Sequence, residues 1–148
     1  MKVEIRKVET PDEEQVILEC VALTKDFRDI RDYVLTKGEQ IAVYTDKTRM
    51  QMICLEQILY IEAVGELVFA YTPEGVFEVK SRLYELEERL VEKKFIRCSK
   101  SMILNLRKIN SIRPALNGRF LAEMENKEEV MVSRQYAKNV KKCIMEGL

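Results

Sequence analysis

The first residues of the chain alternate between apolar and charged side chains, and this pattern predicts a strand. Val3, Ile5 and Val8 are separated by charged positions, close to the two-residue period of a half-buried strand. Residues 15–23 are mostly apolar and indicate a second strand. The Thr-Pro-Asp sequence between the two segments is typical of a turn. We therefore expect two strands before residue 24.

A helix is predicted directly after these strands. Thr24 is of a type that caps helix N-termini, and Gly38 is of a type that follows helix C-termini. Between them, apolar residues recur at helical spacing: Phe27, Ile30, Tyr33 and Val34. Residues 1–38 are thus expected to form a β-β-α extension ahead of a second domain, residues 39–148.

The centre of the chain is expected to consist of short strands separated by turn residues. The predicted strands cover residues 41–45, 49–54, 58–64, 67–72 and 76–79. A helix follows from about residue 81 to 93, with its apolar stripe at Leu83, Leu86, Leu90 and Val91. The glutamates on its other face are interpreted as a solvated surface and not as paired catalytic carboxylates.

Three more strands are predicted near the C-terminus, at residues 109–116, 119–125 and 130–133. Asn117-Gly118 suits a type I′ turn, because both residues tolerate a positive φ. A short final helix would place Tyr136, Val140, Cys143 and Ile144 on one face. The three strands form a meander whose loops are candidate binding edges. The predicted fold class is mainly β, or α+β.

Charge is distributed unevenly along the chain, although the whole sequence has 25 basic and 25 acidic residues. Residues 93–148 contain 13 basic and 5 acidic side chains, and residues 1–92 have the opposite excess. Such asymmetry predicts a polyanion-binding region, with a solvated cationic surface as an equally weighted alternative. No acidic residue interrupts the span from residue 93 to 122, which contains Lys93, Lys94, Arg97, Lys100, Arg107, Lys108, Arg113 and Arg119.

The composition argues against several kinds of chemistry. Histidine is absent, and the four cysteines lie at least 34 residues apart, so we expect buried reduced thiols, no metal site and no cofactor. The glycines are isolated, which excludes a phosphate-binding loop. A Ser–Lys dyad remains formally open at Ser99-Lys100-Ser101, but no enzymatic activity and no small-molecule substrate are expected. The chain lacks a secretory signal or a membrane-spanning run, which predicts a cytoplasmic protein.

The same serines and lysine are better suited to contacts with nucleic acid. Hydroxyl groups and a flexible ammonium bind phosphate oxygens, and Lys or Arg also binds the O6 and N7 atoms of guanine. Arg134 offers this chemistry where a strand gives way to a helix, whose N-terminal amides favour phosphate. Ser133 is either a contact residue or a helix N-cap, and the two roles are compatible.

Five sequence motifs together resemble the LytTR-type DNA-binding domains. Phe95-Ile-Arg-Cys-Ser-Lys-Ser-Met-Ile-Leu-Asn105-Leu is similar to the family signature F-x-R-x-H-x-S-x-x-V-N-L. Val132-Ser-Arg-Gln-Tyr136 is similar to its v-S-R-x-Y ending. Ile58–Glu62, the helix with Leu83–Leu90, and Ile109–Ile112 with the Asn-Gly turn occur in the family's order. The resemblance covers roughly residues 41–145.

The resemblance implies an elongated antiparallel β domain with short helices that regulates transcription. Family members insert loops into successive major grooves, often bend DNA and occupy direct repeats. By position, the DNA-contacting loops of the family correspond to three segments of this sequence. Other polar residues of the matched region are added as candidate contacts. The DNA-binding candidates are Val64, Gly65, Arg97, Ser99, Lys100, Ser101, Asn105, Arg113, Arg119, Ser133 and Arg134.

Two departures from the family pattern affect these expectations. Ser99 replaces the usual histidine, and Val64-Gly65-Glu66 replaces a polar or basic first loop. The sequence preference is therefore expected to differ from that of relatives, and the first loop to contribute little.

The extension also suggests partners. Residues 1–38 are too short for a receiver domain, so the chain resembles stand-alone members of the family, some of which are controlled by a neighbouring membrane protein. The expected partners are double-stranded DNA, a second copy in a homodimer and a membrane-protein regulator. The extension is hypothesised to mediate dimerisation or partner binding, with simple sheet packing as an equal alternative.

Two other functions remain open on the sequence alone. The first is a protein-interaction or sensor module whose basic face binds an acidic partner. The second is RNA binding, which is weaker because the candidate stacking residues Phe95, Phe120 and Tyr136 are interpreted as core residues.

Overall fold

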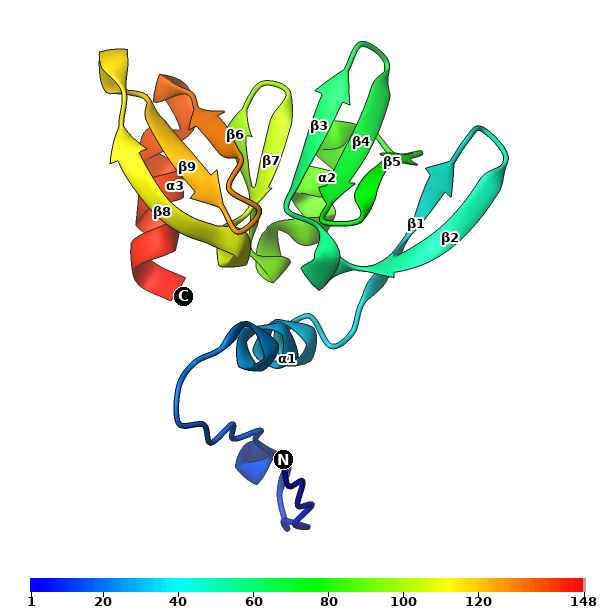
Figure 1. Ribbon diagram of the computed structural model, residues 1–148, viewed down its shortest axis with the longest axis vertical. Coiled ribbons are helices and arrows are strands. Elements are labelled where there is room, and N and C mark those ends of the chain that lie inside the picture. Colours follow the sequence, from blue (N-terminus) through cyan, green and yellow to red (C-terminus); the bar gives the residue numbers. More distant parts are fainter. Residues whose placement is uncertain (148) are drawn as a thin grey trace.

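Two antiparallel sheets make up most of the molecule (Figure 1). The structure, a computed structural model, describes residues 1–147. A seven-stranded sheet has the order β2-β1-β5-β4-β3-β7-β6, and a three-stranded meander has the order β10-β9-β8. The strands are β1 (Gln40–Thr45), β2 (Arg49–Cys54), β3 (Tyr60–Val64), β4 (Leu67–Thr72), β5 (Gly75–Val79), β6 (Phe95–Ser99), β7 (Met102–Asn105), β8 (Ile109–Pro114), β9 (Phe120–Met124) and β10 (Glu129–Val132).

Three α-helices accompany the sheets. They are α1 (Lys25–Leu35), α2 (Leu83–Leu90) and α3 (Arg134–Gly147). Short 3-10 turns connect several elements: Pro11–Glu13, Leu55–Gln57, Val91–Lys93, Leu106–Lys108 and Leu116–Gly118. Among residues 1–147, no helix has both the length and the apolar character that crossing a membrane requires.

The large sheet is covered on both faces around β3, β6 and β7, and each face has its own core. On one face, Leu83, Leu86 and Leu90 of α2 pack against apolar residues of the sheet, including Ile61 and Ile103. On the other face, the meander and α3 pack against β3, β6 and β7. That second core contains Leu59, Tyr60, Ile96, Leu104, Phe120, Val132 and Val140. Neighbouring residues in a strand therefore point into different cores, as the pleat requires.

Most of the predicted elements are confirmed from residue 24 onwards. The predicted strands agree with β1 to β5 and β8 to β10 within a few residues at each end, and the helices agree with α1, α2 and α3. The meander is present in the predicted order. Asn117 and Gly118 have φ values of 62° and 73°, as the predicted turn requires. The fold class is mainly β, as expected.

The hairpin of β6 and β7 is absent from the prediction based on the apolar pattern. Phe95 and Ile103 face the first core, whereas Ile96 and Leu104 face the second. Because both faces of these strands are buried, apolar residues stand next to one another and the two-residue alternation disappears. Only the family motif pointed to this segment.

The two strands expected in the N-terminal extension are not formed. Residues 3–8 and 15–23 belong to no strand, and every residue from 1 to 26 is exposed. This part of the chain contains the predicted helix, α1, and the short 3-10 turn Pro11–Glu13. A strand requires a partner for its backbone N–H and C=O groups, and within residues 1–147 no other segment pairs with these two.

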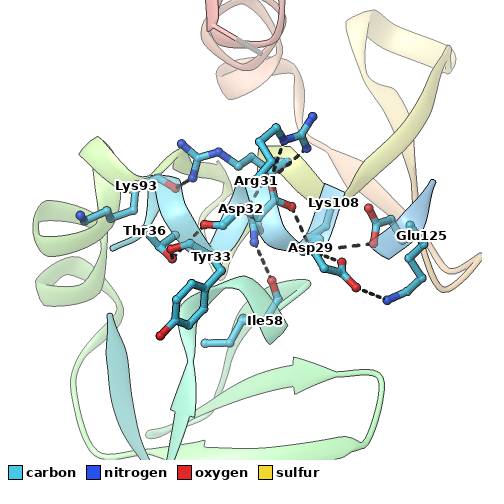
Figure 2. A network of polar contacts seen from close by, with 12 residues as sticks. Asp29, Arg31, Asp32, Tyr33, Thr36, Ile58, Lys93, Lys108 and Glu125 are labelled. Carbon is cyan, nitrogen blue, oxygen red and sulfur yellow. Dashed lines mark hydrogen bonds and ion pairs between the residues drawn. The ribbon is translucent and has the colours of Figure 1, made fainter. Parts of the chain in front are cut away.

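Helix α1 is attached to the domain by a buried ion pair (Figure 2). Lys108 Nζ lies 3.1 Å from Asp32 Oδ2, and the two side chains are only 5% and 1% exposed. Asp29 of the same helix and Glu125 at the end of β9 lie 3.6 and 4.0 Å from the same nitrogen. Lys108 thereby links α1 to the connector between the two sheets.

Candidate nucleic-acid interface

Three loops lie along the same edge of the molecule, opposite the end that carries α1 (Figure 1). They are the β3–β4 turn, the β6–β7 turn and the segment that leads from β10 into α3. Backbone hydrogen bonds hold them in place: Ala63 N–H donates to Ser101 O at 2.7 Å, and Ser133 N–H donates to Cys98 O at 3.0 Å. The three regions that the family motifs indicated are therefore brought together.

The first loop has little polar chemistry. Val64 pairs with Leu67 across the turn and is 54% exposed. Gly65 has a φ of 62°, which glycine adopts without a steric penalty, and no atom approaches the space that a Cβ would occupy. The next residue, Glu66, is exposed. This loop therefore presents an apolar side chain and a negative charge.

The second loop is fixed by Arg97, whose side chain lies beneath it. The guanidinium pairs with Glu87 Oε2 of α2 at 2.6 Å and donates to the carbonyl oxygens of Ser99, at 2.8 Å, and Lys100. A β-bulge between Arg97 and Ser99 shifts the register of β6 at this point. Acceptors of the protein itself therefore occupy the donors of the Arg97 guanidinium. Arg97 holds the loop in shape through these hydrogen bonds.

Lys100, at the tip of the second loop, remains available. Its side chain is exposed and has no ion-pair partner in the described part of the chain, residues 1–147. Ser101 N–H donates to Ser99 Oγ at 3.2 Å, which orders the turn from within. The turn therefore presents a free ammonium group and two hydroxyl side chains.

The third loop joins β10 to α3 at Ser133. The Ser133 hydroxyl donates to Cys98 O at 3.4 Å, and its carbonyl oxygen accepts the N–H of Ala137 at 2.9 Å. The hydroxyl therefore ties α3 to β6, and the first N–H groups of this helix have no intrahelical acceptor. Such a terminus favours a phosphate group.

Arg134 is positioned by the turn between β8 and β9. A Cβ on Gly118 would lie only 3.0 Å from Arg134 Cγ, so the stem of the arginine packs against this glycine. Arg134 is nevertheless exposed. The Asn117-Gly118 turn, predicted as a strand connection only, also supports a candidate base-contacting side chain.

The second and third loops border one open groove. It is lined by Ser99, Lys100, Ser101, Ser133, Arg134 and Gln135. Five of these six residues were expected to contact DNA. Gln135 was not among the candidates, although it stands directly after them in the same motif, and Glu87, which pairs with Arg97, had no signal in the sequence.

The remaining candidates lie away from the three loops or are occupied. Arg113 pairs with Glu129 at 2.7 Å on the exposed face of the meander. Arg119 Nε donates to Leu116 O at 3.0 Å beside the Asn-Gly turn, so it lies near the third loop. Asn105 is buried at the far end of β7, where its amide donates to Ile58 O at 2.8 Å.

The long basic stretch is not a continuous surface. Lys108 is buried in the α1 ion pair, and Arg107 donates to Lys93 O at 3.0 Å on the same side of the molecule. Burial lowers the pKa of the Arg107 guanidinium. The local fold turns these side chains towards α1, so only part of the basic stretch lies at the loop edge.

The expectation of four buried thiols holds only for Cys98. Cys54 and Cys143 are half-buried and Cys20 is exposed. Burial raises the pKa of the Cys98 thiol to about 12, which makes it an inert core residue. Cys20 lies in the segment where the second predicted strand does not form.

Comparison with known proteins gives the same family as the motifs. The model of the LytTr DNA-binding domain family matches residues 48–145. An uncharacterised HTH-type transcriptional regulator of Staphylococcus aureus (strain NCTC 8325) is 32% identical over 107 residues, which are 72% of this chain and 71% of that protein. The sensory transduction protein LytT of Bacillus cereus is 31% identical over 114 residues, 73% of this chain but only 46% of LytT.

A solved structure agrees with these sequence matches. It is described as the LytTr DNA-binding domain of a proposed methyl-accepting/DNA response regulator from Bacillus cereus. Its TM-score is 0.66 at 28% identity, and the match covers 74% of this chain and all of that domain. With the family match over residues 48–145 and the shared fold, the chain belongs to the LytTR DNA-binding domain family.

Proposed function

We propose that this protein is a sequence-specific DNA-binding regulator of transcription that reads DNA with the groove between its second and third loops. The observation that carries the proposal is that Lys100 and Arg134, separated by 34 positions in the sequence, line one open groove. Both side chains are exposed, and neither has an ion-pair partner within residues 1–147. Lys and Arg side chains at such a site suit guanine in the major groove.

The hydrogen-bond donors around these two side chains favour contacts with phosphate. The hydroxyls of Ser99 and Ser101 and the free N–H groups at the start of α3 are donors of the kind that position a protein on the DNA backbone. Arg119 beside the third loop adds charge. Arg97 has an indirect role, because it holds the carbonyl groups of the second loop.

The first loop is proposed to follow the DNA without reading bases through hydrogen bonds. Val64 offers only apolar contact, of the kind that a thymine methyl group accepts. Glu66 would be repelled by phosphate unless it points away from the DNA. The proposed specificity therefore differs from that of relatives with polar first loops.

The wider arrangement is also part of the proposal. Two copies are proposed to occupy direct repeats, with loops in successive major grooves, in the cytoplasm. A membrane-protein regulator is proposed as a further partner. These statements follow from the family, and the row of three loops at one edge supports the insertion into successive grooves.

Substitutions in the groove test the proposal. Arg134→Ala is expected to weaken binding to the selected duplex by about 1–3 kcal/mol and to relax base choice at one position. Lys142→Ala is the matched control, because it removes a cation from the same helix ~12 Å farther along and should change base choice at no position. The measurement is fluorescence anisotropy on specific and random duplexes.

The two duplexes separate the possible outcomes. Loss of affinity for the specific duplex only supports base reading by Arg134. Equal loss on both duplexes would reduce Arg134 to a phosphate contact. Binding with no preference for any duplex would instead favour an interaction module for an acidic partner.

A further inference from the structure

Many apolar side chains of the first 23 residues are exposed to solvent in a single chain. Val3 and Ile5 are 81% and 91% exposed, and Val16, Ile17 and Val21 are also exposed. No strand of residues 1–147 pairs with this segment. Exposed apolar residues in such number usually indicate a surface that is covered in the functional assembly.

The first part of this segment has two distinct faces. Lys2 Nζ lies 2.9 Å and Arg6 Nη2 lies 3.3 Å from the two oxygens of Glu4. These ion pairs place the three charged side chains on one side, as an extended backbone with a two-residue period requires. Val3 and Ile5 therefore share the opposite side, which is the pattern of a strand without a partner.

The turn that follows is already formed. Glu13 Oε2 accepts hydrogen bonds from the N–H groups of Glu9 and Thr10 and from the Thr10 hydroxyl, at 3.2, 3.0 and 3.0 Å. These hydrogen bonds lower the pKa of the Glu13 carboxyl, and the one from the backbone N–H of Thr10 contributes most. The chain thus bends at an ordered turn between two stretches that do not pair with each other.

The size of the uncovered surface fits a protein interface. Nine large apolar residues are exposed in this segment: Met1, Val3, Ile5, Val8, Val16, Ile17, Leu18, Val21 and Leu23. If each buries on the order of 10² Å², the total approaches the ~800 Å² that each partner contributes to a standard interface.

The charges fit a second copy of the same segment. In an antiparallel pair with Ile5 opposite Ile5 of the other copy, Glu4 of each copy faces Arg6 of the other. Val3 then faces the aliphatic stem of Lys7. Opposite charges directly across a pair of strands stabilise it, so the arrangement replaces ion pairs within a chain by ion pairs between chains.

We propose that residues 1–23 are a dimerisation arm, which pairs with the arm of a second copy to form the missing strands. The buried Asp32–Lys108 pair holds α1 on the domain, so arms that pair would join two DNA-binding domains. The inference deepens the proposed function, since it assigns the surface by which two copies meet on repeated sites.

Light scattering on the full chain without DNA tests the arm. The wild-type mass is expected to be twice the 17.4 kDa of one chain. Val3→Asp with Ile5→Asp, and separately Ile17→Asp with Val21→Asp, should each give the mass of one chain. These side chains are exposed in one copy, so the circular dichroism of the domain should remain that of the wild type.

Met145→Asp is the matched control, because Met145 is 87% exposed but lies on α3, outside the arm. It should remain dimeric. A monomeric wild type, which would leave the arm to another partner, overturns the proposal, as do dimeric arm variants or a monomeric control. DNA binding is measured separately: a dimer that binds no DNA contradicts the proposed function alone, and a monomer that binds DNA contradicts the arm alone.

Discussion

At the scale of single residues, the fold assigns different tasks to basic side chains that look alike in the sequence. Lys100 points into the groove, Arg97 holds a loop, and Lys108 is buried against two aspartates. Removing one member of a buried ion pair leaves an uncompensated charge in the interior, which costs far more than losing a surface pair. These roles can be separated by measuring stability and DNA binding on the same variants.

Lys108→Ala is expected to destabilise the domain by about 3 kcal/mol, because Asp32 remains buried and, within residues 1–147, keeps only Arg31 as an ion-pair partner, at 2.9 Å. Denaturant unfolding measures this change. Lys138→Ala, an exposed lysine on α3, should change stability by less than ~0.5 kcal/mol. Asp32→Leu combined with Lys108→Met should regain most of the loss. A Lys108→Ala cost no larger than that of the surface control would contradict the buried pair.

Gly118→Ala is expected to weaken DNA binding through Arg134. The new Cβ would be 3.0 Å from Arg134 Cγ, so the arginine must move, and the backbone at φ 73° is strained by any side chain. In an Arg134→Ala background, the same substitution should cost no further affinity. Anisotropy on all four proteins gives the coupling between the two sites. Additive losses would show that Gly118 acts independently of Arg134.

At the scale of the elements, the two sheets are joined by a polar contact as well as by their common core. Tyr60 of β3 donates to Glu128 in the β9–β10 turn at 2.6 Å, and its ring stacks on Tyr71 of β4 with centroids 4.4 Å apart. Burial raises the pKa of the Tyr60 hydroxyl, and the Glu128 carboxylate raises it further. This contact fixes the meander, and with it the third loop, relative to the second.

Tyr60→Phe is expected to lower stability by about 1 kcal/mol, since Glu128 is exposed and regains water when its donor is lost. The wild type should also lose stability as the pH rises above ~10. Its folded pKa is raised, so the unfolded chain releases the proton first and gains relative stability there. Unfolding followed against pH should show a shallower alkaline loss for Tyr60→Phe. Equal slopes in the two proteins would contradict this role for Tyr60.

The apolar pattern of the sequence predicted elements best where a strand or helix has one face exposed to solvent. The strands β1, β2, β4 and β5, the meander and α2 show clear periods because one side of each is open to solvent. Strand β3 is buried on both faces at Tyr60 and Ile61, and its end was indicated by the turn residue Gly65. The hairpin of β6 and β7 has apolar residues on both faces, so its period is hidden. The strand prediction for the arm was wrong for the opposite reason. The apolar period of residues 1–23 is clear, but no strand within residues 1–147 pairs with them. The loops of the site came from a motif, whereas the Arg97–Glu87 and Asp32–Lys108 pairs arise only from the fold.

At the scale of the whole molecule, the three loops proposed to contact DNA and the attachment of the arm lie at opposite ends (Figure 1). This arrangement leaves the loop edge accessible when two copies associate through their arms. The free cations of the loop edge should make affinity fall with salt. With ~6–10 phosphate contacts, binding is expected to weaken by about 10³-fold or more between ~50 and ~200 mM salt. Titrations at several salt concentrations give the slope, and an affinity independent of salt would contradict the role of these cations.

Selection from a random duplex library, at a stated salt concentration, tests the central claim of sequence-specific reading most directly. The full chain is expected to enrich a pair of repeats about one helical turn apart, ~10.5 base pairs centre to centre. A parallel selection with Arg134→Ala should keep the repeat spacing and lose preference at one position in each repeat. Failure of the wild type to enrich any sequence would contradict DNA reading by the groove of Lys100 and Arg134.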